Sequence, residues 1–338
     1  MHAETPSPQS ILDIGCGYRA SKVLLSAIEL GVFTILSDQP LDATALTQRI
    51  GIHDRGARDF FDTLVALGLL IRDDAGRYAT TLETGLYLDR RKSSYIGSMF
   101  EQYNASEYGL WGSLTQALRT GSPQTGIAAA QHFAGLYADS ARFHRFVKSM
   151  TGGSLLAAKA IAARFPWQDY QTVIDIGTAE GCLPVEVAHA HPHMSGGGFD
   201  LPELREMFEA NIREHGLADR LQFHAGDFFT MPLPPADVIV LGRILHNWNL
   251  DIKRMLLGKA YRALPKGGAL IVHETLIAED RRSNAAGMLA SLNMLLWTAG
   301  GYDFSGSECA EWMREAGFND VQIEPLATEQ SMVIGKKS

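Results

Sequence analysis

The segment 173–181, VIDIGTAEG, constrains the fold of this 338-residue chain more than any other segment. Hydrophobic residues on both sides of Asp175 form a short strand pattern, and Gly177 and Gly181 follow before a helical pattern begins. In parallel sheets, a strand that turns sharply into a helix opens its backbone N–H groups toward a ligand. A second acid, Asp200, follows Gly177 by 23 residues, about where doubly wound sheets hold a ribose. The two features predict a bound nucleoside.

The glycines of this turn do not match the phosphate-binding motifs. A dinucleotide fingerprint has three glycines, whereas the turn supplies only Gly177 and Gly181, and Glu180 would face a pyrophosphate. The GK[ST] end of a Walker phosphate loop is absent from the chain. A nucleoside without phosphates fits better, and S-adenosylmethionine is such a ligand.

Strand and helix patterns alternate after residue 165. This alternation predicts a Rossmann-like domain over 166–338, with a doubly wound, mostly parallel sheet and helices on both faces. Asp175, Asp200 and Asp227 lie at or after the ends of the first three strands, where ligands of such sheets bind. The expected strands are 172–176, 197–200, 221–225, 238–242, 269–274, 321–324 and 332–335, and the expected helices are 183–190, 204–215 and 253–264.

Residues 1–105 have a mostly helical pattern instead. Helices are expected at 21–36, 43–50 and 55–70, and a two-stranded ribbon at 71–81 with its turn at 74–76. This order is that of a winged helix, which binds DNA in some proteins and serves packing or dimerisation in others. We expect a helical connection over 106–165 between the two domains.

The helix expected at 55–70 would contact DNA in a DNA-binding winged helix, and its charges decide between these two functions. Arg55 and Arg58 are the only cations at its start. Three aspartates surround them: Asp54, Asp59 and Asp62. A face that binds phosphates is clearly basic, so we expect a dimerisation domain rather than a DNA-binding domain.

The composition is that of a globular enzyme. The net charge of −8 and the pI near 5.8 argue against nucleic acid or an anionic membrane as the main partner. No apolar run reaches the roughly 18 residues of a spanning helix, and residues 1–10 are too polar for a signal peptide. The three cysteines show no paired spacing, which suits a reducing compartment. We expect a cytoplasmic protein.

Two motifs are less informative than they look. The segment 11–17, ILDIGCG, resembles a methyltransferase turn, but no strand pattern precedes it, and we expect it to begin a helix. The segment 189–193, HAHPH, contains three histidines, but no cysteine or carboxylate cluster completes a metal site. We expect a solvated connection there and no metal.

Six motifs in a fixed order resemble the plant- and bacterial-type small-molecule O-methyltransferases, the family of caffeate and acetylserotonin methyltransferases. The resemblance covers nearly the whole chain. It is specific for the family and weak for the substrate. It implies S-adenosylmethionine as cofactor and a homodimer formed through the N-terminal domain. The motifs are VIDIGTAEG at 173–181, GGGFDLPEL at 196–204, GDFF at 226–229, LHNW at 245–248, ALPKGGALIVHE at 263–274 and EAGF at 315–318.

The resemblance implies roles for the cofactor-binding residues. Asp200 binds the ribose hydroxyls, Asp227 accepts a hydrogen bond from the adenine amino group, and Phe228 stacks on the adenine. Gly177 allows close backbone approach and Trp248 closes over the cofactor. The further expected cofactor residues are Asp175, Gly181, Leu201 and Arg243. Capping of their own loops is the alternative role of Asp175 and Asp227.

The resemblance also implies the catalytic residues. His246 lies where the family has its general base, and a histidine with a pKa near neutrality suits removal of a hydroxyl proton. Glu274 matches the acid that orients this histidine. Asp303 lies where many members have glutamate, so it is the expected second acid.

The acceptor remains open at this point. Arg243, one helical turn before His246, faces either the cofactor or a carboxylate of the acceptor. A hydroxyl acceptor is favoured by family frequency. A thioether acid such as 4-methylthio-2-hydroxybutyrate is the alternative, because aromatic faces stabilise a sulfonium product. A third hypothesis is a non-catalytic S-adenosylmethionine-binding regulator. The expected pocket residues are Tyr103, Trp111, Met288, Asn293, Met294 and Trp297.

Overall fold

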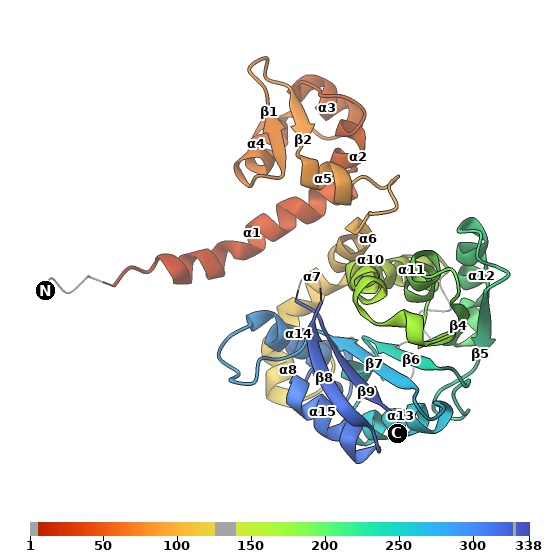
Figure 1. Cartoon of the computed structure of the whole chain (residues 1–338). Coiled ribbons are helices and arrows are strands. Elements are labelled where there is room, and N and C mark those ends of the chain that lie inside the picture. The colour runs from red at the N-terminus through yellow and green to blue at the C-terminus, as the bar shows by residue number, and fades with distance from the viewer. Residues whose placement is uncertain (1–5, 126–139, 327–328) are drawn as a thin grey trace, which may run out of the picture. The chain divides into compact units, whose positions relative to one another are not determined.

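The computed structural model describes residues 6–125, 140–326 and 329–338, and the chain divides into two compact units, Met1–Gly109 and Leu110–Ser338 (Figure 1). Each unit is described by itself. Part of the expected helical connection, 126–139, lies outside the described residues. The three-part division of the chain stays a prediction.

Helices and one small ribbon build the first unit, as its pattern predicts. The elements are α1 (Gln9–Glu29), α2 (Val32–Leu36), α3 (Ala43–Ile50), α4 (Asp54–Ala66), β1 (Leu70–Arg72), β2 (Tyr78–Thr80), α5 (Leu82–Tyr87), α6 (Gly97–Gln102) and a π-helix (Tyr103–Glu107). The expected helix 21–36 is two helices, because the chain turns at Gly31 with a left-handed φ of 72°. The segment 11–17 lies in the first turns of α1, which confirms the expected helix start.

The first unit has its own core and an exposed apolar end. Phe33, Phe61 and Tyr78 are among its buried residues, and α2, α4 and β2 contribute them. Near the start of α1, Ile11 is 73% exposed and Ile14 is 84% exposed. Hydrophobic side chains exposed to this degree mark a surface for association.

A seven-stranded sheet forms the centre of the second unit, in the order β5-β4-β3-β6-β7-β9-β8. The pairings from β5 to β7 are parallel, while β9 pairs antiparallel with β7 and with β8. The sequence therefore predicts the fold class correctly. The strands are β3 (Thr172–Ile176), β4 (Ser195–Asp200), β5 (Leu221–Ala225), β6 (Val238–Gly242), β7 (Ala269–Glu274), β8 (Asn319–Pro325) and β9 (Ser331–Lys336).

Helices cover both faces of this sheet (Figure 1). In β6, Ile239 and Leu241 pack in one core with α13 and α15, while Val238 and Val240 pack in another with α10 and α11. This two-sided burial explains why the strand is a continuous apolar run. The helices are α7 (Tyr108–Leu110), α8 (Leu114–Thr120), α10 (Ser140–Arg164), α11 (Cys182–Ala190), α12 (Arg205–Glu214), α13 (Leu250–Ala263), α14 (Ala285–Trp297) and α15 (Gly306–Glu315), with 3-10 turns at Trp111–Ser113, Trp167–Asp169, Pro202–Leu204 and Leu245–Asn247.

The strand order reverses between the parallel neighbours β3 and β6, because the chain adds β4 and β5 on one side of β3 and adds β7 on the far side of β6. Ligands of doubly wound sheets bind beyond the carboxyl ends of the strands at this point. Among the described helices, none has the length and apolar character that a membrane span requires.

Candidate active site

The turn after β3 is built by residues with left-handed backbone. Gly177 and Gly181 have φ values of 72° and 86°, and Ala179 between them has 52°. A Cβ on Gly177 would lie 2.2 Å from Cδ1 of Ile244, which follows β6. The left-handed backbone therefore favours glycine at position 177, and any larger residue would also displace the end of the Ile244 side chain. The non-glycine residue in the same conformation, Ala179, is a strain that functional turns often contain.

Asp200 fastens this turn to the end of β4. Its Oδ2 accepts a hydrogen bond from the backbone N–H of Ala179 at 2.9 Å, and its Oδ1 accepts one from that of Leu201 at 2.8 Å. Burial raises the pKa of Asp200 to about 6, and the two N–H donors act against this rise. Burial also raises the pKa of Asp175, at the end of β3, to about 7. The two carboxylates lie where the nucleoside is expected.

Three aromatic rings, Phe228 and Phe229 after β5 and Trp248 after β6, pack against one another. Phe228 lies 6.1 Å from Trp248 between ring centroids, and Phe229 lies 4.9 Å from Trp248 in an edge-on arrangement. The sequence interpretation missed Phe229, although it is the second phenylalanine of the GDFF motif. Asp227 caps this loop, because its Oδ1 accepts a hydrogen bond from the N–H of Phe229 at 2.8 Å. The indole N–H of Trp248 is buried and finds no acceptor within the described part of the chain, as a donor kept for a ligand would.

One premise of the sequence argument needs correction. The carboxylate of Glu180 does not stand free to repel a phosphate, because its Oε2 lies 2.8 Å from Nζ of Lys148 in α10. Glu180 is buried, so this pairing compensates its charge. The argument against phosphates rests on the missing third glycine and on the absent GK[ST] motif.

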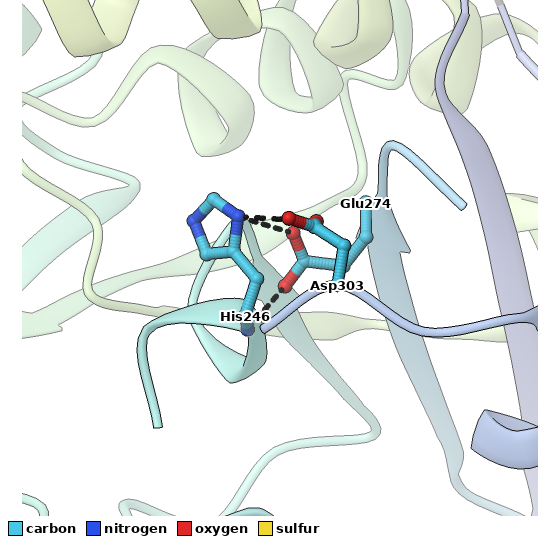
Figure 2. A group of neighbouring side chains, drawn as sticks. All are labelled: His246, Glu274 and Asp303. Atoms are coloured by element: carbon cyan, nitrogen blue, oxygen red, sulfur yellow. Dashed lines mark hydrogen bonds and ion pairs between the residues drawn. The ribbon is translucent and has the colours of Figure 1, made fainter. Parts of the chain in front are cut away.

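His246, Glu274 and Asp303 meet at the same edge of the sheet (Figure 2). Nδ1 of His246 lies 3.4 Å from Oδ1 of Asp303 and 3.6 Å from Oε2 of Glu274. The backbone N–H of His246 donates to Oε1 of Glu274 at 3.3 Å. All three residues are buried, and the other ring nitrogen of His246 points away from both carboxylates (Figure 2). The sequence thus predicts three residues that the fold brings together.

Opposing effects set the proton affinity of this group. Burial lowers the pKa of His246, but the carboxylates of Glu274 and Asp303 outweigh burial and leave that pKa above its ordinary value. Burial raises the pKa of Glu274 to about 7, while His246 opposes the rise. The imidazole of His246 and the carboxylate of Glu274 therefore titrate as a coupled pair.

Close backbone packing fixes the segments that bear these residues. A Cβ on Gly301 would lie 2.5 Å from the carbonyl oxygen of His246, so glycine is needed there. The N–H of Asp303 donates to Oγ of Ser291 in α14 at 3.2 Å. A Cβ on Gly287, also in α14, would lie 2.6 Å from the carbonyl oxygen of Leu276. Helix α14 thus packs directly on the chain that follows β7.

Most of the expected pocket residues lie on or beside α14. Nε1 of Trp111 donates to Oδ1 of Asn293 at 3.1 Å, which joins the 3-10 turn Trp111–Ser113 to this helix. Helix α14 also contacts the 3-10 turn that carries His246. Three further expected residues are on α14. Met288 and Trp297 are half-buried, and Met294 is buried. Tyr103 belongs to the first unit, so its place in the pocket stays a prediction.

Arg243 begins the segment between β6 and His246. It has a left-handed φ of 55°, and its N–H donates to the carbonyl oxygen of His273 at 2.9 Å. Its half-buried guanidinium makes no hydrogen bond or ion pair with the described residues. A cation held in this way at the edge of the sheet is available to an anionic group of a ligand.

The His246 group is also the only set of three metal-type ligands found in the described parts of the chain, with ligand atoms within 4.8 Å of one another. The histidines of 189–193 do not form such a set. Instead, Nε2 of His191 lies 2.7 Å from the carbonyl oxygen of Ala162, and Nε2 of His193 lies 3.1 Å from that of Trp167. Two of the three histidines, His189 and His193, are exposed, as a solvated connection would be.

Comparisons with known proteins cover both units. Residues 111–319 match an O-methyltransferase domain and residues 12–90 match an O-methyltransferase dimerisation domain. A tetracenomycin polyketide synthesis 8-O-methyl transferase, TcmO of Streptomyces glaucescens, is 38% identical over 99% of this chain and 98% of its own. The N,N-dimethyltransferase OxyT of Streptomyces rimosus is 36% identical over 96% of this chain and 94% of its own. The crystal structure of human N-acetylserotonin methyltransferase in complex with S-adenosylmethionine matches over 100% of both chains, with a TM-score of 0.91 and 28% identity.

Proposed function

This chain belongs to the S-adenosylmethionine-dependent O-methyltransferase family, the plant- and bacterial-type enzymes of secondary metabolism, and we propose that it methylates a hydroxyl oxygen of a small acceptor with His246 as general base. One observation carries the proposal. Nδ1 of a buried histidine faces two carboxylates, and the opposite ring nitrogen is turned away from them (Figure 2).

The residues around the turn after β3 fit S-adenosylmethionine. Each oxygen of Asp200 accepts one backbone N–H, which leaves lone pairs for two ribose hydroxyls. Phe228 offers a ring face to the adenine, and the buried N–H of Trp248 awaits an acceptor. Arg243 suits the carboxylate of the methionine part. The remaining proposed cofactor residues line the turn and its neighbours: Asp175, Gly177, Gly181, Leu201 and Asp227.

His246 has two tasks in this proposal. Its Nδ1 faces the carboxylates of Glu274 and Asp303, which favour a proton on Nδ1 and leave Nε2 as the acceptor of a proton. When bound, S-adenosylmethionine supplies a sulfonium methyl group, which moves to the acceptor oxygen as the carbon–sulfur bond breaks. The hydroxyl proton passes to Nε2, and the two carboxylates stabilise the imidazolium that forms. The family has no metal requirement, so no metal enters this scheme.

The names of the relatives narrow the choice of the atom that accepts the methyl group. TcmO is named for methylation of an oxygen and OxyT for methylation of a nitrogen. Neither name describes a sulfur acceptor, so the thioether alternative has no support from them. We propose a hydroxyl on an aromatic acceptor, with Trp111, Asn293 and the methionines of α14 in its pocket. The Trp111–Asn293 hydrogen bond leaves the amide N–H₂ of Asn293 as a donor to the acceptor.

We also propose that the chain acts as a homodimer through its first unit. The match to a dimerisation domain covers residues 12–90, and the start of α1 exposes Ile11 and Ile14. Light scattering on the full chain tests this proposal. A monomer at micromolar concentration would contradict it.

A transfer assay tests the proposed acceptor class. Labelled S-adenosylmethionine is incubated with panels of phenols, aromatic amines and methylthio acids, and labelled products are separated. We expect phenols to be methylated by the wild type and not by His246→Gln. The matched control is His189→Gln, which changes an exposed histidine in the last turn of α11. Methylation of amines or methylthio acids alone would reject a hydroxyl acceptor.

A further inference from the structure

Lys253, on the inner face of α13, is the least expected charge in the second unit. It is 0% exposed and lies among apolar residues of the same helix face such as Leu256 and Leu257. No carboxylate of the described residues lies within 4.0 Å of its ammonium. Burying a charge without a close counter-ion costs several kcal/mol unless other groups replace its water.

Aromatic rings and one carbonyl replace that water. Nζ of Lys253 lies 3.1 Å from the ring centroid of Tyr302, 5.1 Å from that of Phe304 and 5.7 Å from that of Trp312. It also donates a hydrogen bond to the carbonyl oxygen of Tyr302 at 2.9 Å. Ring faces attract a desolvated cation, so this cage holds the ammonium in its charged form.

The cage is built from the neighbours of a proposed catalytic acid. Tyr302 and Phe304 flank Asp303 in the sequence. These two rings face Lys253, while the carboxylate between them faces His246. Lys253 therefore holds the short segment whose middle residue contacts the imidazole.

The charges of the region explain why a cation is useful there. When His246 is neutral, as a base must be, Glu274 and Asp303 are two buried carboxylates that need compensation. Lys253 and Arg243 are the cations that act on this group. The other ionisable groups around them come from β7 and α15: His273, Glu308 and Cys309.

We propose that Lys253 is a positioning residue for methyl transfer, which holds segment 302–304 in place and stabilises the ionised carboxylates of Glu274 and Asp303 while His246 is neutral. This inference rests on the proposed role of His246 as general base. Burial lowers the pKa of Lys253 to about 8, while Glu274, Asp303 and Glu308 oppose the fall. The side chain of Lys253 is thus mostly protonated at neutral pH and loses its proton in moderate alkali.

Titration of His246 tests the inference without any acceptor. The full-length protein is labelled on its histidine rings, and the NMR signal of His246 is identified by its loss in His246→Gln. We expect Lys253→Met to raise the pKa of His246 by about half a unit or more, because a nearby positive charge that opposed protonation is gone. A folded Lys253→Met protein whose His246 titrates as in the wild type would overturn the inference.

The control is Arg254→Met, which removes a cation from the next position of α13. Arg254 forms an exposed ion pair with Glu315, so its loss should leave the pKa of His246 unchanged. If Lys253→Met does not fold, the reciprocal measurement decides. Because linkage is mutual, Asp303→Asn should lower the pKa of Lys253, measured on labelled lysine side chains, and an unchanged value would reject the inference.

The inference and the proposed function can fail separately. A protein that methylates no phenol while Lys253→Met still shifts the titration of His246 rejects the hydroxyl acceptor only. A protein that methylates phenols without that shift rejects the role of Lys253 only. In the transfer assay, Lys253→Met should reduce kcat and leave the KM for S-adenosylmethionine near its wild-type value.

Discussion

The proposed cofactor half and the proposed acceptor half of this site lie at one edge of the same sheet, and their acidic side chains have different partners. The carboxylate of Asp200 accepts two backbone N–H groups and is a fixed part of the turn. The carboxylates of Glu274 and Asp303 face an imidazole instead, and Oδ2 of Asp303 has no hydrogen-bond partner among the described residues. The first arrangement suits binding of a neutral ribose. The second arrangement suits a group that takes up and releases a proton.

The largest expected effect is on the acceptor half. His246→Gln keeps a polar side chain but removes the base, so kcat for a hydroxyl acceptor should fall by about 10²–10⁴-fold. Binding of S-adenosylmethionine should stay within about threefold of the wild type, because Asp200 and its turn are untouched. Rapid quench kinetics and calorimetry measure the two quantities. A similar loss of cofactor affinity would mean that the halves are not separate.

Asp200→Asn should give the opposite result. It removes charge-assisted hydrogen bonds worth about 1.5–3 kcal/mol, so the Kd for S-adenosylmethionine should rise by roughly 10- to 150-fold. At saturating cofactor, kcat should change much less. Calorimetric titration measures the Kd. Glu203→Gln, which neutralises an exposed carboxylate of the same segment, should bind the cofactor normally.

The pH dependence should also separate the halves. The base must be neutral, and the pKa of His246 lies above its ordinary value of 6.5. As the pH is lowered, kcat should therefore begin to fall while the pH is still above 6.5. Below the pKa of His246, kcat should drop about tenfold per pH unit. Cofactor affinity should hold until the pH falls below about 6, where Asp200 takes up a proton. Kinetics and calorimetry from pH 5 to 9 provide both curves. Two curves with one shared midpoint would contradict separate control.

The smallest expected effect concerns the aromatic loop. Phe229→Ala removes the ring that packs edge-on against Trp248, an arrangement worth about 0.5–1.5 kcal/mol. The Kd for S-adenosylmethionine should rise by roughly 2- to 12-fold, while kcat should change little. Phe229→Leu, which keeps most of the apolar volume, is the control. An unchanged Kd in Phe229→Ala would exclude this ring from cofactor binding.

The sequence predicts the structure around the turn after β3 well because this region is local. The strand, the turn and Asp200 lie within 28 residues of one another, and the strand β3 is found at its predicted bounds. The break at Gly31 was missed because the apolar spacing of 21–36 continues across it. The role of Glu180 was also misjudged, since its partner Lys148 comes from a distant helix.

The acceptor half depends on segments that only the fold brings together. His246 lies in the 3-10 turn after β6, Glu274 ends β7 and Asp303 precedes α15. The family resemblance, and not their spacing, indicates these residues. No pattern indicated that Lys253 would be buried, because its charge suggests a surface position. Its ring cage appears only when α13 packs against the segment before α15.

Helix α14 lies outside the sheet and is anchored through Gly287 to the chain after β7. Its proposed pocket positions therefore lie apart from the strands of the sheet, although Ser291 of the same helix accepts the N–H of Asp303. If the proposed pocket is correct, substitutions in this one helix and at its partner Trp111 change the acceptor. A scaffold divided in this way can diversify quickly, and relatives named for oxygen and for nitrogen acceptors are what such divergence would leave behind.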